Sequence, residues 1–124
     1  MDTIRTAISE CALDDIEVLK DGTVRRRYRF RPDFIGFSGH FPGYPILPAF
    51  IQIMAALFML EELKGHELIL ESLEKAKFYV EIKPDMTVEI TCRERMRLGK
   101  PTVEANLRVG EERAAAFFLV YQKA

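Results

Sequence analysis

The feature that most constrains this chain is an apolar run from residue 45 to residue 60. Within the run, Gln52 is the one clearly polar residue. A helix that crosses a bilayer needs about 20 apolar residues, whereas this run is shorter and is followed by Glu61 and Glu62. The run therefore predicts a helix buried inside a folded protein, and such a helix must be covered on nearly every side.

The ends of this helix are marked by Pro48 and Gly65. Proline is tolerated in the first turn of a helix because its missing N–H has no partner there. Glycine is typical of the position that follows the last turn. We therefore expect a helix from about residue 48 to residue 64.

The segments around the helix predict an antiparallel sheet. Before the helix, residues 16–19 and 23–30 flank Asp21-Gly22, a pair typical of a tight hairpin turn. The strands expected after the helix are residues 68–82, 87–95, 102–109 and 113–122, separated by segments that contain Gly or Pro.

The expected order of elements is a hairpin, a loop, the long helix and an antiparallel meander. A single α+β domain over residues 1–124, with the sheet curled around the helix, satisfies this order, whereas a doubly wound parallel sheet does not. Six strands leave part of the helix uncovered, so we also expect a homodimer.

Composition narrows the possible partners. The net charge of −1 gives no global basic field for nucleic acid. Cys11 and Cys92 match no metal-binding spacing and form no disulfide framework, which indicates a reducing, cytoplasmic compartment. The amino-terminal residues do not read as a signal peptide, and no membrane association is expected.

The second strand of the hairpin alternates between two faces. Val24, Tyr28 and Phe30 share one face with Arg26, and the other face carries only arginines between residues 25 and 31. We expect the arginine face to be solvated. A dock for an acidic carrier protein or for a phosphate is the alternative.

The loop before the helix carries the strongest motif. Residues 39–48 read Gly-His-Phe-Pro-Gly-Tyr-Pro-Ile-Leu-Pro. This segment resembles the active-site loop of the β-hydroxyacyl-acyl-carrier-protein dehydratases of fatty-acid synthesis, which have the hotdog fold. Weaker similarity continues through residues 75–78 and 83–85. The Pro-Ile-Leu-Pro variant followed by Gln52 is closer to the thioester-dehydratase-like proteins of aryl-polyene pathways. The resemblance implies a hotdog fold and an acyl-thioester substrate.

Two positions depart from the family pattern. Ala49 replaces the glycine after the last proline, and Met54 replaces the acidic residue expected five positions later. The thioether of Met54 cannot transfer protons, so we expect this side chain to fill the core.

The resemblance, together with the chemistry of the side chains and of the helix start, predicts roles for three residues. His40 is the expected catalytic base and acid, because imidazole exchanges protons near neutral pH. The backbone N–H of Ala49 is expected to stabilise negative charge on the thioester oxygen. Gln52 is expected either to position the substrate or a water, or to form a hydrogen bond with the loop backbone.

The substrate is expected to be an acyl-carrier-protein or coenzyme A thioester, and neither a metal nor another cofactor is expected. Tyr44, at the variable position of the family, is expected to pack on the surface. The residues expected to contact the substrate are Gly43, Phe41, Ala49, Phe50, Ile53 and Met54. For any one of the helix residues in this set, ordinary core packing is the competing interpretation.

Three functional classes remain open at this point. A lyase that acts on 3-hydroxyacyl thioesters is favoured by the histidine loop. A non-catalytic protein that binds acyl chains or carriers is favoured by Met54. A hotdog thioesterase ranks below both, because Met54 removes the obvious carboxylate and Ser38 has no evident partner.

Overall fold

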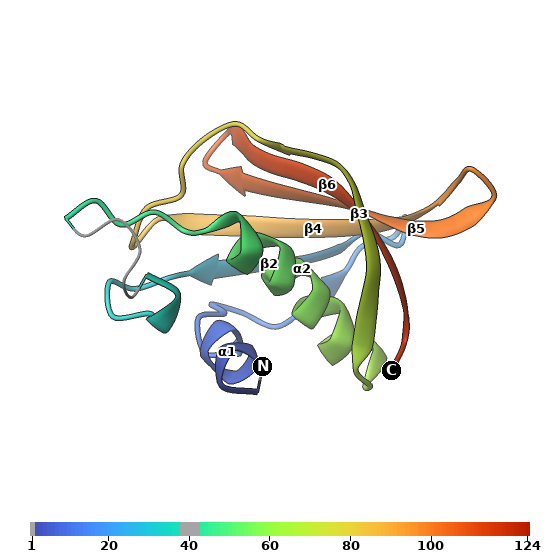
Figure 1. Ribbon diagram of the computed structural model, residues 1–124, viewed down its shortest axis with the longest axis horizontal. Helices are drawn as coiled ribbons and strands as arrows, with labels where there is room; N and C mark the ends of the chain where they lie inside the picture. The colour runs from blue at the N-terminus through green and yellow to red at the C-terminus, as the bar shows by residue number, and fades with distance from the viewer. Residues whose placement is uncertain (1, 38–42) are drawn as a thin grey trace.

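A computed structural model describes residues 2–37 and 43–124 of the chain. Its elements in chain order are α1 (Asp2–Ser9), β1 (Glu17–Val18), β2 (Val24–Arg29), the short 3-10 helix η1 (Ile35–Phe37), α2 (Ala49–Lys64), β3 (Leu68–Phe78), β4 (Thr87–Arg97), β5 (Lys100–Val109) and β6 (Glu112–Lys123). The strands form one six-stranded antiparallel sheet that curves around α2 (Figure 1). The expected α+β architecture is confirmed.

The strand order is β1-β2-β4-β5-β6-β3. The meander is confirmed for β4, β5 and β6, but the expectation that the strand after the helix continues it is wrong. β3 pairs with β6 at the far edge of the sheet because β2 already occupies the free side of β4. This strand also ends at Phe78 rather than at residue 82.

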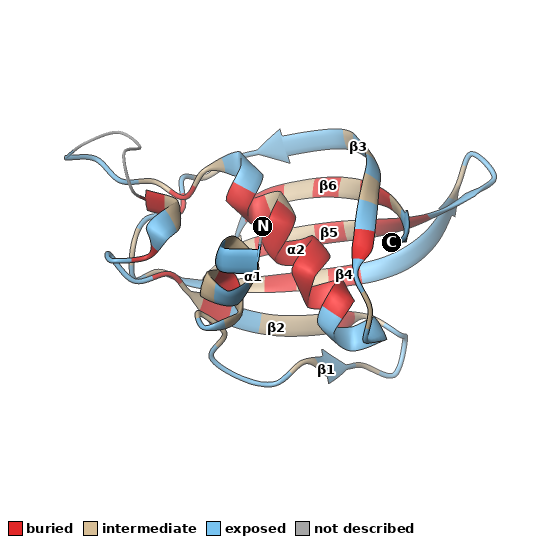
Figure 2. Cartoon of the chain, turned by 60° about the horizontal axis from the view of Figure 1, so that its bottom comes forward, coloured by how far each residue is buried: buried red, intermediate tan, exposed pale blue. Residues whose placement is uncertain are grey.

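α2 crosses the concave face of the sheet, and Figure 2 shows its buried residues running along most of its length. Gly65 ends the helix as expected, with φ of 80° and its N–H donated to the Glu61 carbonyl at 2.8 Å. At both ends the predicted helix is therefore confirmed to within a residue. In the described part of the chain, no helix has the length and apolar character needed to traverse a bilayer.

The hairpin before α2 is also confirmed. Gly22 has φ of 89°, and the side chain of Asp21 accepts a hydrogen bond from the Thr23 N–H at 3.0 Å. β1 and β2 pair antiparallel, with Val18 opposite Val24. In β2, Val24 and Tyr28 are buried against the core as the alternation predicts.

Helix α1 was not expected from the sequence. Ile4, Ala7 and Ile8 recur at helical spacing, but the helix is only eight residues long, and a helix that short is marginal on its own. Ile8 is 1% exposed and anchors the helix in the core. α1 therefore owes its position to tertiary contacts rather than to a strong local preference for helix.

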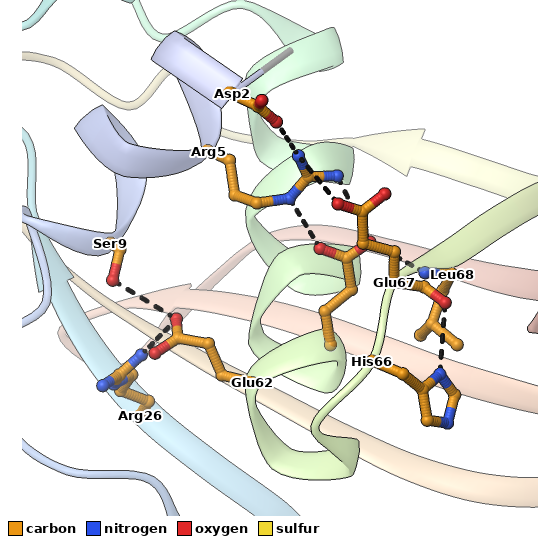
Figure 3. A network of polar contacts seen from close by, with 9 residues as sticks. Asp2, Arg5, Ser9, Arg26, Glu62, His66, Glu67 and Leu68 are labelled. Carbon is orange, nitrogen blue, oxygen red and sulfur yellow. Dashed lines mark hydrogen bonds and ion pairs between the residues drawn. The ribbon is translucent and has the colours of Figure 1, made fainter. Parts of the chain in front are cut away.

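A polar network fastens α1 to the carboxyl-terminal end of α2 (Figure 3). Arg5 donates from Nε to Glu61 Oε1 at 2.8 Å, and Glu61 Oε2 accepts the backbone N–H of Leu68 at 2.8 Å. The guanidinium of Arg5 also lies 4.6 Å from the centre of the Phe58 ring. One buried carboxylate, 6% exposed, thus joins α1, α2 and the first residue of β3.

We expect Glu61→Ala to lower the free energy of unfolding by about 2–4 kcal/mol, because it leaves a buried N–H and a guanidinium without their acceptor. Urea denaturation followed by circular dichroism measures this change. Glu62→Ala is the matched control. Glu62 is more exposed and also binds an arginine, Arg26, so its loss is expected to cost less than about 1 kcal/mol. Equal effects of the two substitutions would contradict the special role of Glu61.

Candidate active site

A cavity of about 340 Å³ lies between the start of α2 and the segment that follows β3. Its volume is within the range of small-molecule sites. Most of the lining is apolar, with an amide, a phenol and a carboxylate as the polar side chains. The lining residues are Ile46, Leu47, Pro48, Ala49, Gln52, Phe78, Tyr79, Val80 and Glu81.

The amino-terminal end of α2 contributes unpaired N–H groups to this region. Pro48 caps the helix with φ of −62° and ψ of 149°, and Ala49 is the first helical residue. The first N–H to find a helical acceptor is that of Gln52, which donates to the Pro48 carbonyl at 3.1 Å. Within the described residues, the N–H groups of Ala49, Phe50 and Ile51 have no such acceptor. Partial positive charge therefore gathers at the cavity.

Gln52 places a buried amide at the same site. Its side chain is 4% exposed, and its Nε2 donates to the Leu47 carbonyl at 3.1 Å. Its Oε1 is buried and, among the described residues, has no hydrogen-bond donor. A buried unpaired carbonyl costs about 1–3 kcal/mol. The side chain therefore holds the loop backbone, and its Oε1 is a buried polar atom beside the cavity that lacks a donor among the described residues.

The loop that precedes α2 is tied to the wall of the cavity. The Leu47 N–H donates to the Ile82 carbonyl at 2.7 Å, and the Tyr44 hydroxyl donates to Glu81 Oε1 at 2.6 Å. The bond to the Glu81 carboxylate, together with its negative charge, raises the pKa of Tyr44. Lys83 Nζ lies 5.5 Å from the centre of the Tyr44 ring. Tyr44 is 51% exposed, in agreement with the surface position expected for it.

The site residues predicted from the sequence occupy different places. His40 and Phe41 lie outside the described residues. Ala49 and Gln52 come together at the cavity. Gly43 has φ of 82°, a conformation that favours glycine, but it is not part of the lining.

The three remaining helix residues do not line this cavity. Phe50 is 53% exposed, Ile53 is half-buried against the core, and Met54 is 7% exposed within the core. Their contact with substrate stays a prediction. Core packing of Met54, the competing interpretation, agrees with its burial.

Sequence reasoning missed the wall formed by Phe78, Tyr79, Val80 and Glu81. These residues were assigned to the interior of a strand that was expected to end at residue 82. The sequence gives no clear signal for this early end, because the residues after Phe78 continue the pattern of the strand, and the exposure of Phe78 and Tyr79 is seen only in the structure.

The arginines of β2 are mostly paired within the chain. Arg25 binds Glu17, Arg26 binds Glu62 and Arg27 binds Asp14. These ion pairs neutralise the arginines within the chain. They favour a solvated strand face over a binding site for an acidic carrier protein or a phosphate.

Comparison with known proteins identifies the family. The model of the ApeI-like family, described as ApeI dehydratase, matches residues 16–116. The chain belongs to the ApeI-like dehydratase family. The matched region includes β2, the loop before α2, α2 itself and the cavity wall.

Curated relatives of this ApeI-like chain carry the name 3-hydroxyacyl-[acyl-carrier-protein] dehydratase FabZ. The protein from Alkaliphilus metalliredigens is 34% identical over 96 residues, which cover 68% of this chain and 63% of that protein. The protein from Streptococcus equi subsp. zooepidemicus is 30% identical over 123 residues, which cover 92% of this chain and 81% of that protein.

Solved structures confirm the hotdog fold of the ApeI-like chain. The dehydratase heterocomplex ApeI:P from Xenorhabdus doucetiae matches with a TM-score of 0.72 at 20% identity, covering 89% of this chain and 95% of that one. The E. coli PaaI protein of the phenylacetic acid degradation operon matches with a TM-score of 0.67 at 12% identity, covering 98% and 88% of the two chains. A Streptococcus mutans protein bound to acetyl CoA matches with a TM-score of 0.65 at 10% identity, covering 89% and 87%.

Proposed function

We propose that this chain dehydrates 3-hydroxyacyl thioesters, carried by acyl carrier protein or coenzyme A, in fatty-acid or polyene-type lipid synthesis. The observation that best supports this proposal is the pairing of a buried, unpaired acceptor on Gln52 with unpaired N–H groups at the start of α2, beside one apolar cavity. A 3-hydroxyacyl thioester offers a hydroxyl donor, a carbonyl acceptor and an apolar tail. The hydroxyl matches the Gln52 acceptor, the carbonyl matches the N–H groups, and the tail matches the apolar cavity.

The reaction needs a group that moves two protons. His40 takes the proton from the carbon next to the thioester carbonyl, and negative charge develops on the carbonyl oxygen. The N–H of Ala49 donates to that oxygen and stabilises it. His40 then donates the proton to the 3-hydroxyl oxygen, and the bond between this oxygen and carbon 3 breaks. The products are water and a 2-enoyl thioester.

Gln52 takes the positioning role in this scheme. Its Nε2 is already engaged by the Leu47 carbonyl, which leaves Oε1 to accept the substrate hydroxyl. Met54 contributes no proton transfer, so His40 alone acts as base and acid.

Two alternatives keep specific support. A binding protein without activity is favoured by Met54 at the position of the family acid. A thioesterase would use Glu81, the carboxylate among the described residues of the cavity wall, to activate water. Glu81 Oε1 already accepts the hydrogen bond of Tyr44, which leaves fewer acceptor sites for a water and ranks this alternative lower.

We also propose that the chain works as a homodimer. β3 is eleven residues long, and among the strands of the described residues it hydrogen-bonds to β6 alone. A long unpaired sheet edge readily pairs with another strand, and the exposed apolar residues Ile69, Leu73 and Phe78 lie on β3. A second copy paired along β3 would cover this edge, and light scattering distinguishes the dimer from a monomer.

We expect the purified chain to convert a 3-hydroxyacyl thioester to the 2-enoyl thioester and water, detected as loss of water by mass spectrometry. His40→Ala is expected to lower kcat/KM by about 10²- to 10⁴-fold, because the acid–base group is lost. Release of the free acid would instead indicate a thioesterase. Binding without turnover would indicate the non-catalytic alternative.

Ala49→Pro tests the proposed N–H donor. Proline fits the first helical position, and the extended backbone of Pro48 suits a residue that precedes proline. We therefore expect the variant to fold normally but to lose about 10²- to 10³-fold in kcat because one oxyanion donor is missing. Ala49→Ser keeps the N–H and serves as the matched control. Full activity of the proline variant would remove this N–H from the mechanism.

Gln52→Leu tests the acceptor. We expect turnover of 3-hydroxyacyl thioesters to fall about tenfold, which corresponds to one neutral hydrogen bond. Binding of a saturated acyl thioester is expected to stay unchanged, because this ligand has no 3-hydroxyl group. Calorimetry measures that binding. If the saturated ligand were weakened equally, Gln52 would have a purely structural role.

A further inference from the structure

The β4–β5 hairpin extends beyond the rest of the sheet (Figure 1), and its outer part is exposed (Figure 2). At the tip, Leu98 is 89% exposed and Met96 is 69% exposed. Among the described residues these are the two most exposed large apolar side chains. Neither one contributes to the core, so core packing gives no reason for their apolar character.

The backbone at the tip also disfavours leucine. Arg97 pairs with Lys100, which leaves Leu98 and Gly99 as the two turn residues. Their φ angles are 50° and 76°. Such turns favour Asn, Asp or Gly at the first position, because a bulky L-residue is strained at positive φ. Leu98 is therefore disfavoured both by its contact with water and by its backbone conformation.

Positive charge surrounds the apolar tip. Between residues 93 and 101 the chain carries Arg93, Arg95, Arg97 and Lys100 against the single acid Glu94. Arg95 and Arg97 pair with Glu104 and Glu74. Within residues 2–37 and 43–124, neither Arg93 nor Lys100 forms an ion pair. With Arg95 and Arg97 neutralised in this way, Lys100 at the turn and Arg93 further down the strand supply the positive charge beside the two exposed apolar side chains.

We propose that this hairpin tip docks on an anionic lipid surface, with Leu98 and Met96 in the interfacial region and the cations among the lipid phosphates. Apolar side chains ringed by Lys and Arg suit such a surface. A stable protein interface buries about 800 Å² on each partner. A projecting two-residue turn is too small to bury that much area against another protein, whereas a few apolar side chains are enough to insert into the surface of a bilayer.

The orientation of the hairpin is compatible with catalysis. The loop before α2, described from residue 43, lies at the end of the molecule away from the hairpin in Figures 1 and 2. Docking through the tip therefore leaves the cavity accessible to a thioester in solution. The expectation of no membrane association rested on the lack of a spanning segment, and this proposal concerns the surface alone.

Vesicle co-sedimentation of the full chain tests the proposal, with phosphatidylcholine vesicles and with an equal mixture of phosphatidylcholine and phosphatidylglycerol. We expect binding to the mixed vesicles only, and weaker binding at high salt. Leu98→Asn is expected to reduce binding at least threefold, on the order expected for partial loss of one buried leucine. Val18→Thr is the matched control, because Val18 is 59% exposed on β1, outside the hairpin, and its replacement is expected to leave binding unchanged.

The same Leu98→Asn variant separates a docking role from a structural one. Because asparagine suits positive φ, we expect its melting temperature to rise by about 2–4 °C while vesicle binding falls. Dehydratase turnover in solution is expected to stay unchanged. Wild-type protein that ignores the mixed vesicles, or a variant that binds them equally well, would overturn the proposal. Binding of an acidic carrier protein through Leu98, without vesicle binding, would also overturn it.

Discussion

The structure depends on the burial of one helix on nearly all sides. α2 is apolar around its circumference, and a sheet that curls over it is one way to remove that surface from water. The ends of such a helix raise a separate problem, because backbone groups there lack helical partners. At the carboxyl-terminal end the chain solves it internally. The Gly65 N–H donates a hydrogen bond to the Glu61 backbone carbonyl, and the Glu61 carboxylate binds α1 and β3. At the amino-terminal end, three backbone N–H groups have no helical acceptor among the described residues, and the cavity lined by Gln52 lies beside them.

This asymmetry explains why the candidate site lies where it does. A helix start with unpaired N–H groups attracts partial negative charge, and the low dielectric of an apolar cavity strengthens that attraction. Gln52 adds a polar atom that no described residue satisfies, at a position where an apolar residue would be more stable. Both features are costly without a partner, and the proposed 3-hydroxyacyl thioester would supply a partner for each.

The long elements were predictable because their signals are local. The limits of α2 follow from Pro48 and Gly65, and the first hairpin follows from Asp21-Gly22. The position of β3 was not predictable, since strand order depends on which edge is already occupied. Of the site, Gln52 and Ala49 could be found from the motif. The wall around Tyr79 and Glu81 could not, because it arises from the early end of a strand whose sequence continues the same pattern.

Gln52 and Leu98 depart from local rules at sites far apart in this molecule, and both differ from Arg25 and Arg27 of β2. Arg25 and Arg27 looked unusual in the sequence, yet each has a carboxylate partner, and nothing remains to be explained. Gln52 is buried without a donor for its Oε1, and Leu98 is exposed at a positive φ. Departures from local rules tend to occur where function requires them. The proposed substrate hydroxyl would satisfy the amide, and the proposed lipid surface would remove the leucine side chain from water.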